Sequence, residues 1–341
     1  MNLNELLRTA HERGASDLHL TVGAPPMIRL HGGLVPLAME RLTPQDTNEM
    51  ARELLAGDAY EALAKQGEYD FSWELEGVCR FRINAYRQRG TLSLAARLVP
   101  TRIPSPEELG LPDTLLQFVH RQQGLFLVTG PTGSGKSTTL ASLIDHINKR
   151  MNKRIITLED PIEYMHAHSQ SIIEQREVGR DTHSFANGLR AALRQDPDVI
   201  LVGEMRDLET IATAVTAAET GHLVLATLHT SDSPQTIDRI VDVFPPAQQQ
   251  QIRVQLAAVL LGVVSQRLLP LAKGNGRVAA QEILVNTPAV ANLIRSDKGH
   301  QIRTAMQTGK ALGMQTLEIH LQELVRRGAI TEKTAREHSL D

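Results

Sequence analysis

The sequence contains a single cysteine, Cys79, in 341 residues. A disulfide within the chain is therefore excluded, and so is a zinc site built from four cysteines. So little cysteine is typical of a reducing compartment, so we expect a cytoplasmic protein. The N-terminal stretch MNLNELLRTAHERG carries Glu5, Arg8 and Glu12 among its apolar residues, which is not the pattern of a signal peptide.

Long hydrophobic runs and aromatic side chains are also scarce. The longest apolar run, LAAVLLGVV at 256–264, has about half the length of a membrane-spanning helix, so a buried helix is expected there. The protein should reach a membrane only through a partner. Aromatic residues make up 3% of the chain and the net charge is −3, which argues against a nucleic-acid-binding protein.

Four prolines mark the segment PTRIPSPEELGLPD at 100–113. Proline at this density does not continue a helix or a central strand, so we predict an interdomain linker rather than a long loop inside one domain. Residues 1–99 mix short alternating strands with helical patterns, which predicts a small α+β domain. One of its helices should begin after Thr43, a suitable N-cap.

The residues after the linker, 114–341, have a different pattern. Wholly apolar runs without alternation indicate strands that are buried on both faces, and helical patterns lie between them. These runs are LFLVT (125–129), RIITL (154–158), VILV (199–202) and LVLAT (223–227). The alternation of strands and helices predicts an α/β domain with a parallel, doubly wound sheet. Beyond residue 247 the chain should be mainly helical, with one further strand at 277–285.

The first of these runs leads directly into GPTGSGKS at 130–137, which satisfies G-x-x-x-x-G-K-[ST], the Walker A pattern of a P-loop. Glycines let backbone N–H groups turn inward around phosphate oxygens, and the start of the next helix adds a positive dipole end. Lys136 should reach the outer phosphates and the Ser137 hydroxyl should bind Mg²⁺. The predicted cofactors are ATP and Mg²⁺. The predicted nucleotide-binding residues are Gly130, Thr132, Gly133, Ser134, Gly135, Lys136, Ser137 and Thr138.

Carboxylates follow two further predicted strands. TLEDPIEY at 157–164 places three of them at the carboxyl end of a strand, the edge where open parallel sheets bind ligands. We expect Glu163 to activate water, and Glu159 and Asp160 to hold the metal through water or to fix the loop; a solvated acidic turn is the alternative. DVILVGEMRD has the Walker B form, with Glu204 as a ligand of Mg²⁺ or an orienter of water. Which of Glu163 and Glu204 is the water-activating base stays open.

Histidines flank a third strand in TGHLVLATLHT at 220–230. We expect His222 and His229 at the same sheet edge, where a histidine can hydrogen-bond the γ-phosphate or change protonation with nucleotide state. They lack the cysteine or carboxylate partners of a metal site. His166 and His168 are expected to be loop residues.

The strand CRFRINAY at 79–86 has one apolar and one cationic face, with Arg80 and Arg82 on the latter, and Arg97 ends the next strand. A cationic face on a protein of net negative charge suits a polyanion. RNA, acidic lipid and a nucleotide on another subunit are the candidates, and in the last case the arginines would stabilise the transferring phosphoryl group in trans. An ordinary solvated face is the alternative.

Several stretches together resemble the signature boxes of the secretion-type ring ATPases, and within them the type IV pilus retraction motors. The similarity runs in order over almost the whole chain. It rests on ASDLHL (15–20), GPTGSGKST (130–138), TLEDPIEY (157–164), LRQDPDVILVGEMRD (193–207) and TGHLVLATLHT (220–230). By this resemblance Glu163 matches the catalytic glutamate, Glu204 the Walker B acid, and His222 and His229 the His-box pair.

The resemblance also implies a molecular motor and its assembly. It is a cytoplasmic homohexamer at the inner-membrane face, in which each subunit has a PAS-like N-terminal domain and a RecA-like ATPase domain. Arg82 and Arg97 match the N-terminal-domain arginines that approach the nucleotide. ATP hydrolysis would move an inner-membrane platform protein (PilC-like), so that pilin subunits leave the fibre base and the cell shows twitching motility. Neither nucleic acid nor direct membrane insertion is expected.

Two features distinguish this chain among such relatives. Pilus-assembly and type II secretion ATPases tend to be longer and carry a four-cysteine metal site, which one cysteine cannot build, so retraction is favoured. Retraction motors share a stretch AIRNLIRE, whereas residues 289–296 read AVANLIRS and lack an arginine and the terminal glutamate. The alternatives are an accessory retraction paralogue, an assembly, secretion or DNA-uptake ATPase, a nucleic-acid translocase, or a nucleotide-binding regulator without turnover.

Overall fold

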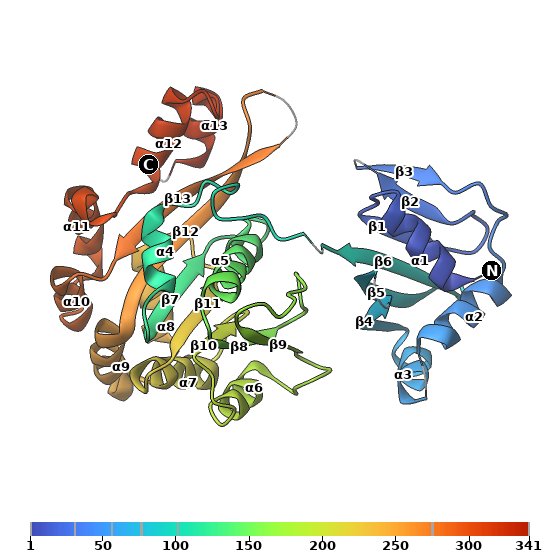
Figure 1. The fold of residues 1–341 in the computed structure, drawn as a ribbon, viewed down its shortest axis with the longest axis horizontal. Helices are drawn as coiled ribbons and strands as arrows, with labels where there is room; N and C mark the ends of the chain where they lie inside the picture. The colour runs from blue at the N-terminus through green and yellow to red at the C-terminus, as the bar shows by residue number, and fades with distance from the viewer. Residues whose placement is uncertain are drawn as a thin grey trace. The chain divides into compact units, whose positions relative to one another are not determined.

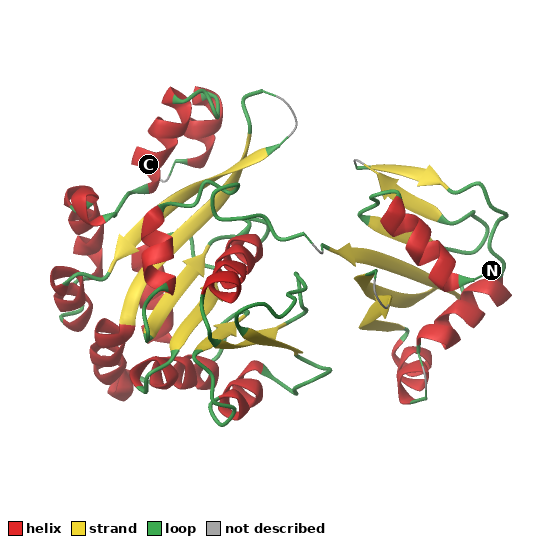
Figure 2. Ribbon diagram, in the orientation of Figure 1, coloured by secondary structure: helices red, strands yellow, loops and turns green. Residues whose placement is uncertain are grey.

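The computed structural model describes residues 2–30, 32–55, 57–75, 78–100, 102–273 and 276–339. The described residues form two compact units that divide between Arg102 and Ile103, and Glu163–Met165 are grouped with the first (Figures 1 and 2). Residues 102–112 contain neither helix nor strand. Thr101 of the predicted linker and both chain ends of the predicted domains lie outside the described residues.

The first unit is built on a six-stranded antiparallel sheet in the order β3-β2-β1-β6-β5-β4. Its strands are β1 (Asp17–Leu20), β2 (Met27–Leu30), β3 (Gly33–Pro36), β4 (Glu68–Leu75), β5 (Cys79–Gln88) and β6 (Thr91–Val99). Its helices are α1 (Leu3–Glu12), α2 (Pro44–Leu54) and α3 (Asp58–Gln66). Figure 2 shows the helices and the sheet of this α+β unit.

Local sequence explains these elements. Thr43 caps α2 as expected: its hydroxyl accepts from the N–H of Asp46 at 3.2 Å, and Asp46 accepts from the N–H of Thr43 at 2.7 Å. Neither β3 nor α3 is predicted from the sequence. Every residue of β3 is exposed, so this edge strand carries no burial pattern.

Cys79 begins β5 and is buried in the core of the first unit. Burial raises the pKa of its thiol to about 11. The thiol is therefore protonated at neutral pH.

The second unit is an α/β domain with a seven-stranded sheet in the order β13-β12-β7-β11-β10-β8-β9. All pairings are parallel except that of β12 with β13. The strands are β7 (Gly124–Thr129), β8 (Arg154–Glu159), β9 (Ile172–Glu177), β10 (Val199–Val202), β11 (Leu223–Leu228), β12 (Leu260–Pro270) and β13 (Arg277–Val285). The five strands predicted for this part of the chain are confirmed, and β9 and β12 are additional.

Helices cover both faces of this sheet (Figure 1). They are α4 (Asp113–Val119), α5 (Lys136–Arg150), α6 (Phe185–Ala192), α7 (Leu208–Glu219), α8 (Ser233–Asp242), α9 (Pro246–Val259), α10 (Pro288–Arg295), α11 (Ile302–Thr308), α12 (Leu317–Arg326) and α13 (Glu332–His338), with short 3₁₀ turns at Gly299–Gln301 and Lys310–Leu312. Phe126 of β7 packs with α4 and α5, whereas Leu125 and Leu127 pack with α7, α8 and α9. Both faces of β7 are thus buried, which explains its apolar run without alternation.

The expectation of one buried helix over 256–264 is wrong. Helix α9 ends at Val259 and β12 begins at Leu260, so the apolar run is divided between the two elements. Because β12 lies between β7 and β13 and is largely buried, it has no alternating pattern that would distinguish it from a helix. Among the helices of the described residues, none is both long enough and apolar enough to cross a membrane.

Candidate active site

Four parallel strands end at one edge of the second sheet. Thr129 at the end of β7 pairs with Leu228 at the end of β11, and Val202 at the end of β10 pairs with Leu158 of β8. The segments that carry the Walker A loop, the acidic stretch, Glu204 and His229 therefore all leave the sheet from its carboxyl edge, where parallel sheets bind ligands.

The Walker A loop lies between β7 and α5 as predicted. Gly130, Gly133 and Gly135 have φ angles of 142°, 79° and 87°, a region that side chains with a Cβ rarely adopt. A Cβ on Gly130 would lie 2.2 Å from the main-chain oxygen of Gln266 on β12. Glycine is thus required at this position both for its backbone conformation and for the close approach of β12.

Lys136 is the first residue of α5, and its side chain turns back onto the loop. Its ammonium donates to the carbonyl oxygens of Gly130 at 2.8 Å and Pro131 at 3.0 Å. Burial lowers the pKa of Lys136, and the nearby negative charge of Glu204 opposes that shift. Ser137 follows at an exposed position of the first turn, and Thr138 is half-buried.

Glu204 and His229 are brought together at the sheet edge. One carboxylate oxygen of Glu204 lies 3.1 Å from Nε2 of His229, and the other lies 2.6 Å from Nε of Arg206. Gly203 precedes Glu204 and packs tightly on β8, since a Cβ there would lie 3.0 Å from the carbonyl oxygen of Leu158. This close packing explains why a residue without a side chain precedes the acid of the Walker B segment.

The acidic stretch after β8 divides into residues with different surroundings. Glu159 accepts hydrogen bonds from the Thr157 hydroxyl at 2.6 Å and from Nε2 of Gln175 at 3.1 Å. This geometry favours the loop-fixing role among the two expected for Glu159. Asp160 and Glu163 are exposed. Glu163 is grouped with the first unit, and its part in hydrolysis stays a prediction.

His222 does not lie at the edge expected for it. It precedes β11, and its carbonyl accepts from the N–H of Gly124 at the start of β7. Nδ1 of His222 lies 2.9 Å from the carbonyl oxygen of Ala217 at the end of α7. The strand β11 separates it from His229 by roughly 20 Å, at about 3.3 Å per residue. The predicted placement is therefore wrong, because two residues that flank one strand lie at opposite sheet edges.

His166 and His168 lie in a loop, as expected. Burial lowers the pKa of His166 to about 4, so it is neutral at physiological pH. Nδ1 of His168 accepts from the N–H of Ile173 at 3.2 Å.

The cationic face of the first unit is narrower than predicted, because Arg80 is buried. Arg82 and Arg97 are exposed and stand directly opposite each other on β5 and β6. Asp17 of β1 accepts from Nε of Arg97 at 2.9 Å and lies 4.0 Å from Nε of Arg29. Two like charges face to face are unfavourable, and the carboxylate of Asp17 offsets part of this repulsion at Arg97.

Two residues without a sequence signal, Glu177 of β9 and Gln266 of β12, support the site. Ile162 in the acidic loop donates its N–H to the buried carboxylate of Glu177 at 3.1 Å. Gln266 of β12 contacts the Walker A loop. No local signal identifies either residue, because one lies on the unpredicted β9 and the other on the unpredicted β12.

A magnesium ion that accompanies ATP is compatible with this site. Among the described residues no three histidine, cysteine, aspartate or glutamate side chains form a metal-binding group. Mg²⁺ with a nucleotide needs only one or two protein oxygens, because phosphates and water complete its coordination. The hydroxyl of Ser137 and the carboxylate of Glu204 are suitable donors; Glu159 and Asp160 stay predictions as ligands through water.

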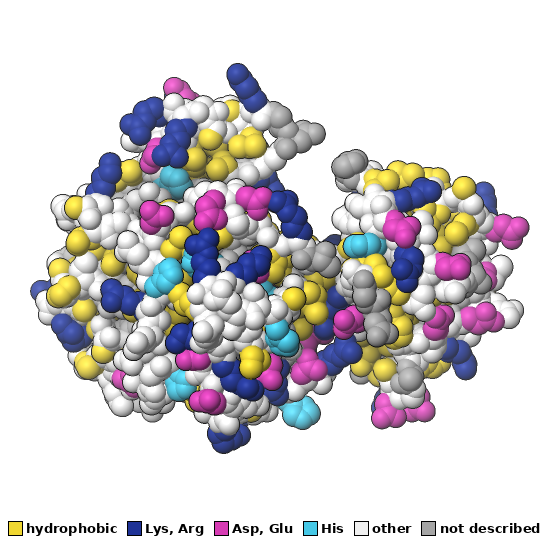
Figure 3. Space-filling model, viewed as in Figure 1, with side chains coloured by type: hydrophobic (Ala, Val, Ile, Leu, Met, Phe, Trp, Pro, Cys, Tyr) yellow, Lys and Arg dark blue, Asp and Glu magenta, His cyan; other side chains and the backbone are white. Residues whose placement is uncertain are grey.

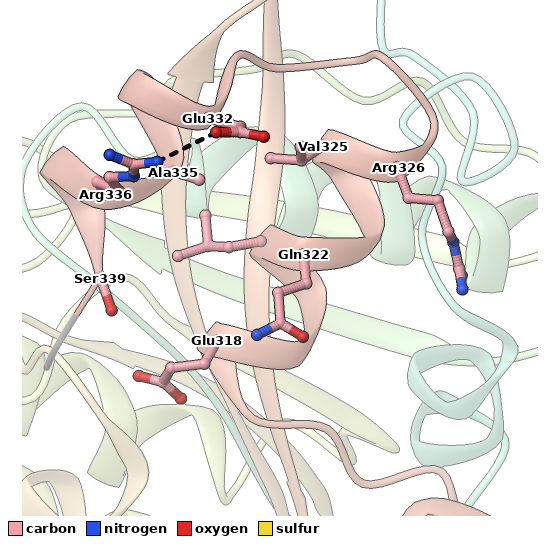
Figure 4. Close-up of a pocket in the computed structure, with 9 residues that line it drawn as sticks. Glu318, Gln322, Val325, Arg326, Glu332, Ala335, Arg336 and Ser339 are labelled. Carbon is pink, nitrogen blue, oxygen red and sulfur yellow. Dashed lines mark hydrogen bonds and ion pairs between the residues drawn. The ribbon is translucent and has the colours of Figure 1, made fainter.

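A pocket of about 510 Å³ lies elsewhere, between α12 and α13 (Figure 4). Glu332 and Arg336 are paired at 3.1 Å on α13, and Glu318 and Gln322 of α12 also line the pocket. None of its lining residues is a predicted nucleotide-site residue. The assignment of the nucleotide site therefore rests on the chemistry of the sheet edge.

Comparisons with known proteins agree with this geometry. Residues 106–339 match the family described as "Type II/IV secretion system protein". The type IV pilus retraction ATPase PilT of Pseudomonas aeruginosa is 47% identical over 337 residues, which cover 99% of this chain and 98% of the relative. The type IV pilus ATPase PilU of the same organism is 40% identical over 339 residues, or 99% and 89% of the two chains. A crystal structure of the pilus retraction motor PilT with bound ADP has a TM-score of 0.93 and 51% identity, covering 100% of this chain and 98% of that one.

Proposed function

This chain belongs to the type II/IV secretion system protein family and is an ATP hydrolase, and we propose that it couples ATP hydrolysis to type IV pilus retraction. The observation that carries the proposal is similarity to the retraction ATPase over nearly the full length of both chains. Glu204, His229 and the complete Walker A loop at one sheet edge supply the chemistry that such a motor needs.

In the proposed reaction the loop binds phosphates through its backbone N–H groups and the start of α5. The ammonium of Lys136, now on the carbonyls of Gly130 and Pro131, turns to phosphate oxygens. Glu163 or Glu204 positions and deprotonates the attacking water, and His229 orients the Glu204 carboxylate. Mg²⁺, when bound with ATP, neutralises charge on the phosphates.

The assembly is part of the proposal. We infer a cytoplasmic homohexamer at the inner-membrane face, in which Arg82 and Arg97 approach the nucleotide. Their exposed positions, directly opposite each other on β5 and β6, support this role. The motor would act on a PilC-like platform protein and through it on pilin. Basic and acidic side chains are interspersed over the described residues on the face in Figure 3, which agrees with a protein partner better than with nucleic acid.

The AVANLIRS stretch lies mainly on α10 and bears on the choice between main motor and accessory paralogue. Val290, Ala291 and Ile294 are buried, and Ser296 is an exposed C-cap. Ala291 stands where the retraction motors carry arginine, and Ser296 where they carry glutamate. Because α10 packs on α9 and carries no residue of the Walker A loop, we infer that the change leaves the ATPase chemistry intact. Ala291 lies in the packed face of α10, so only the change at Ser296 lies on a surface that a partner can contact.

The deciding experiment uses a piliated host that lacks its retraction ATPase. We would express this chain, and separately Glu204→Ala, and measure twitching and the number of surface pili. A retraction motor restores twitching and lowers the pilus number, whereas the variant does neither. If the purified chain hydrolyses ATP but the pili are unchanged, the ATPase assignment stands and the retraction proposal fails.

The altered α10 favours a second candidate, an accessory retraction paralogue, and this candidate has its own test. The double variant Ala291→Arg, Ser296→Glu is expressed alone in the same host. If twitching appears only with this variant, the natural chain is an accessory paralogue whose α10 does not drive retraction unaided. Equal twitching with both chains supports the main-motor proposal.

A further inference from the structure

Gln266 of β12 holds the Walker A loop from outside. The residue is 2% exposed, and its side chain makes hydrogen bonds to the loop and to the helix that follows it. Nε2 donates to the carbonyl oxygen of Ser134 at 2.7 Å, and Oε1 accepts from the hydroxyl of Thr139 at 2.9 Å. Ser134 belongs to the loop and Thr139 to the first turns of α5. One amide therefore ties the turn of the loop to the helix that follows it.

The backbone of the loop lies directly against the same residue. A Cβ on Gly130 would meet the main-chain oxygen of Gln266 at 2.2 Å, and one on Gly135 would meet its Nε2 at 2.8 Å. The backbone of Gln266 thus excludes a side chain at Gly130, and its amide lies close against Gly135. The shape of the loop depends on a residue more than a hundred positions away in the sequence.

Gln281 on the neighbouring β13 extends this contact toward the C-terminal helices. Its side chain, 1% exposed, donates from Nε2 to Oε1 of Gln266 at 3.2 Å. Its main-chain N–H donates to Nδ1 of His320 on α12 at 2.9 Å, and its carbonyl accepts from Nε2 of Gln315 at 2.9 Å. Burial lowers the pKa of His320, which keeps Nδ1 available as an acceptor.

We propose that Gln266 is a positioning residue for the phosphate-binding loop, and that Gln281 couples the occupancy of this loop to the seating of α12. A buried glutamine whose oxygen and nitrogen both have partners transmits a shift of either partner, because breaking one bond leaves a buried polar group unsatisfied. The inference rests on nucleotide binding at the loop, as the proposed function does, and is independent of the pilus.

The first test replaces Gln266 by methionine, which has a similar volume and no hydrogen-bonding amide. Two lost hydrogen bonds that shape the free loop should raise the Kd for ADP and the KM for ATP about tenfold, with kcat changed much less. The matched control is Gln251→Met on the exposed side of α9, which should leave all three constants unchanged. Equal constants for wild type and Gln266→Met would overturn the positioning role.

The second test is Gln266→Glu, whose behaviour should depend on pH. A protonated carboxyl can donate to Ser134 and accept from Thr139 as the amide does, whereas a carboxylate repels the Ser134 carbonyl and the phosphates. Burial raises the pKa of a carboxyl group, so the new side chain should become protonated as pH falls. The affinity of Gln266→Glu for ADP should therefore recover toward the wild-type value as pH is lowered from about 8 to about 6. A merely space-filling role predicts a constant ratio of variant to wild-type Kd, and that result would refute the proposal.

The coupling is tested by hydrogen exchange in the full-length chain. ADP should slow exchange of the Gln281 amide and of α12 in the wild type, and this effect should disappear in Gln266→Met at saturating ADP. Equal protection of α12 in both proteins would overturn the coupling. If the wild type itself binds no ADP, the proposed function fails; if all variants bind ADP as the wild type does, only this inference fails.

Discussion

Lys136 donates to two carbonyls of its own loop. A buried ammonium without partners would be costly, so these bonds hold both the side chain and the loop in place. ATP therefore exchanges neutral acceptors for charged phosphate oxygens, and charge-assisted hydrogen bonds are stronger than neutral ones.

Lys136→Ala should therefore weaken ADP and ATP binding by about a hundredfold, which corresponds to the loss of charge-assisted hydrogen bonds. Calorimetric titration of the purified chain measures this directly. Lys149→Ala is the matched control on the same helix, because its partner Asp145 lies outside the loop and Lys149 is largely exposed. Unchanged affinity in Lys136→Ala would remove the loop from the nucleotide site.

Two glutamates compete for the role of water-activating base. Glu204→Gln and Glu163→Gln should both bind ATP, and the true base should lose about 10²–10⁴-fold in kcat. Single-turnover hydrolysis separates this loss from product release. Glu209→Gln, at an exposed residue paired with Arg190, is the control. Wild-type turnover in both variants would contradict our interpretation of the acidic strand ends.

At the scale of elements, the crossing of the Walker A loop and β12 sets a steric limit. Gly130→Ala would place a Cβ 2.2 Å from the Gln266 carbonyl, so the loop or the strand must move. We expect at least a tenfold loss of ADP affinity, on the scale of about 1.4 kcal/mol. Gly221→Ala also has a positive φ, but its nearest atom would be 4.0 Å away, so it should cost only about 1–2 kcal/mol of stability and leave affinity intact. Similar affinities in the two variants would argue against the crossing as a determinant of loop shape.

A buried carboxylate holds the start of α8 to β13. Glu282 accepts from the N–H and the hydroxyl of Ser233, each at 2.8 Å, and burial raises its pKa. A raised folded-state pKa gives stability that is fully present below the ordinary value of 4.5 and is lost as pH rises through the folded value. The thermal stability of Glu282→Gln relative to that of the wild type should thus increase as pH rises above about 4.5. Glu282→Leu should lose about 2–4 kcal/mol, because both Ser233 donors lose their acceptor. A parallel pH profile for wild type and Glu282→Gln would show that the carboxyl is not the titrating group.

Strongly patterned elements are those that the sequence predicts. The wholly apolar runs become β7, β8, β10 and β11, and the Walker A loop follows the first of them. The β12 strand escapes prediction because a strand buried on both faces and a buried helix share the same composition. Its absence from the prediction also hides Gln266, whose role arises from contacts distant in sequence.

Placement errors within the site have equally simple causes. His222 and His229 are close in sequence, but a strand runs between them, so its length separates them in space. Arg80 has the alternation of a cationic face, yet the unit buries it while leaving Arg82 exposed. Periodicity identifies a face of a strand and does not say how much of that face the rest of the fold covers.

At the scale of the whole molecule, the first unit carries the arginines and the second carries the phosphate loop. If Arg82 acts on the nucleotide of another subunit, Arg82→Ala should lower kcat about 10³-fold or more with little change in ADP affinity. Arg87→Ala, at an exposed residue of the same strand, should keep wild-type turnover. ATPase assays at protein concentrations that favour assembly provide the comparison.

Mixing two inactive variants shows whether that arginine acts in trans. Subunits with Arg82→Ala retain an intact Lys136, and subunits with Lys136→Ala retain an intact Arg82. Mixed rings should regain part of the wild-type turnover, because some intact arginines then meet intact loops. If the mixture is as inactive as its components, the interpretation of Arg82 as part of an ordinary solvated face would be favoured.

The buried Cys79 makes movement of the two units directly observable. With a thiol pKa of about 11, only about one molecule in ten thousand carries the thiolate at pH 7, and the thiolate is the form that attacks a maleimide dye. One cysteine introduced on the surface of each unit would therefore accept a donor and an acceptor fluorophore while the native residue stays unlabelled. Energy transfer between the two dyes can then follow the chain through its catalytic cycle with its native core unaltered.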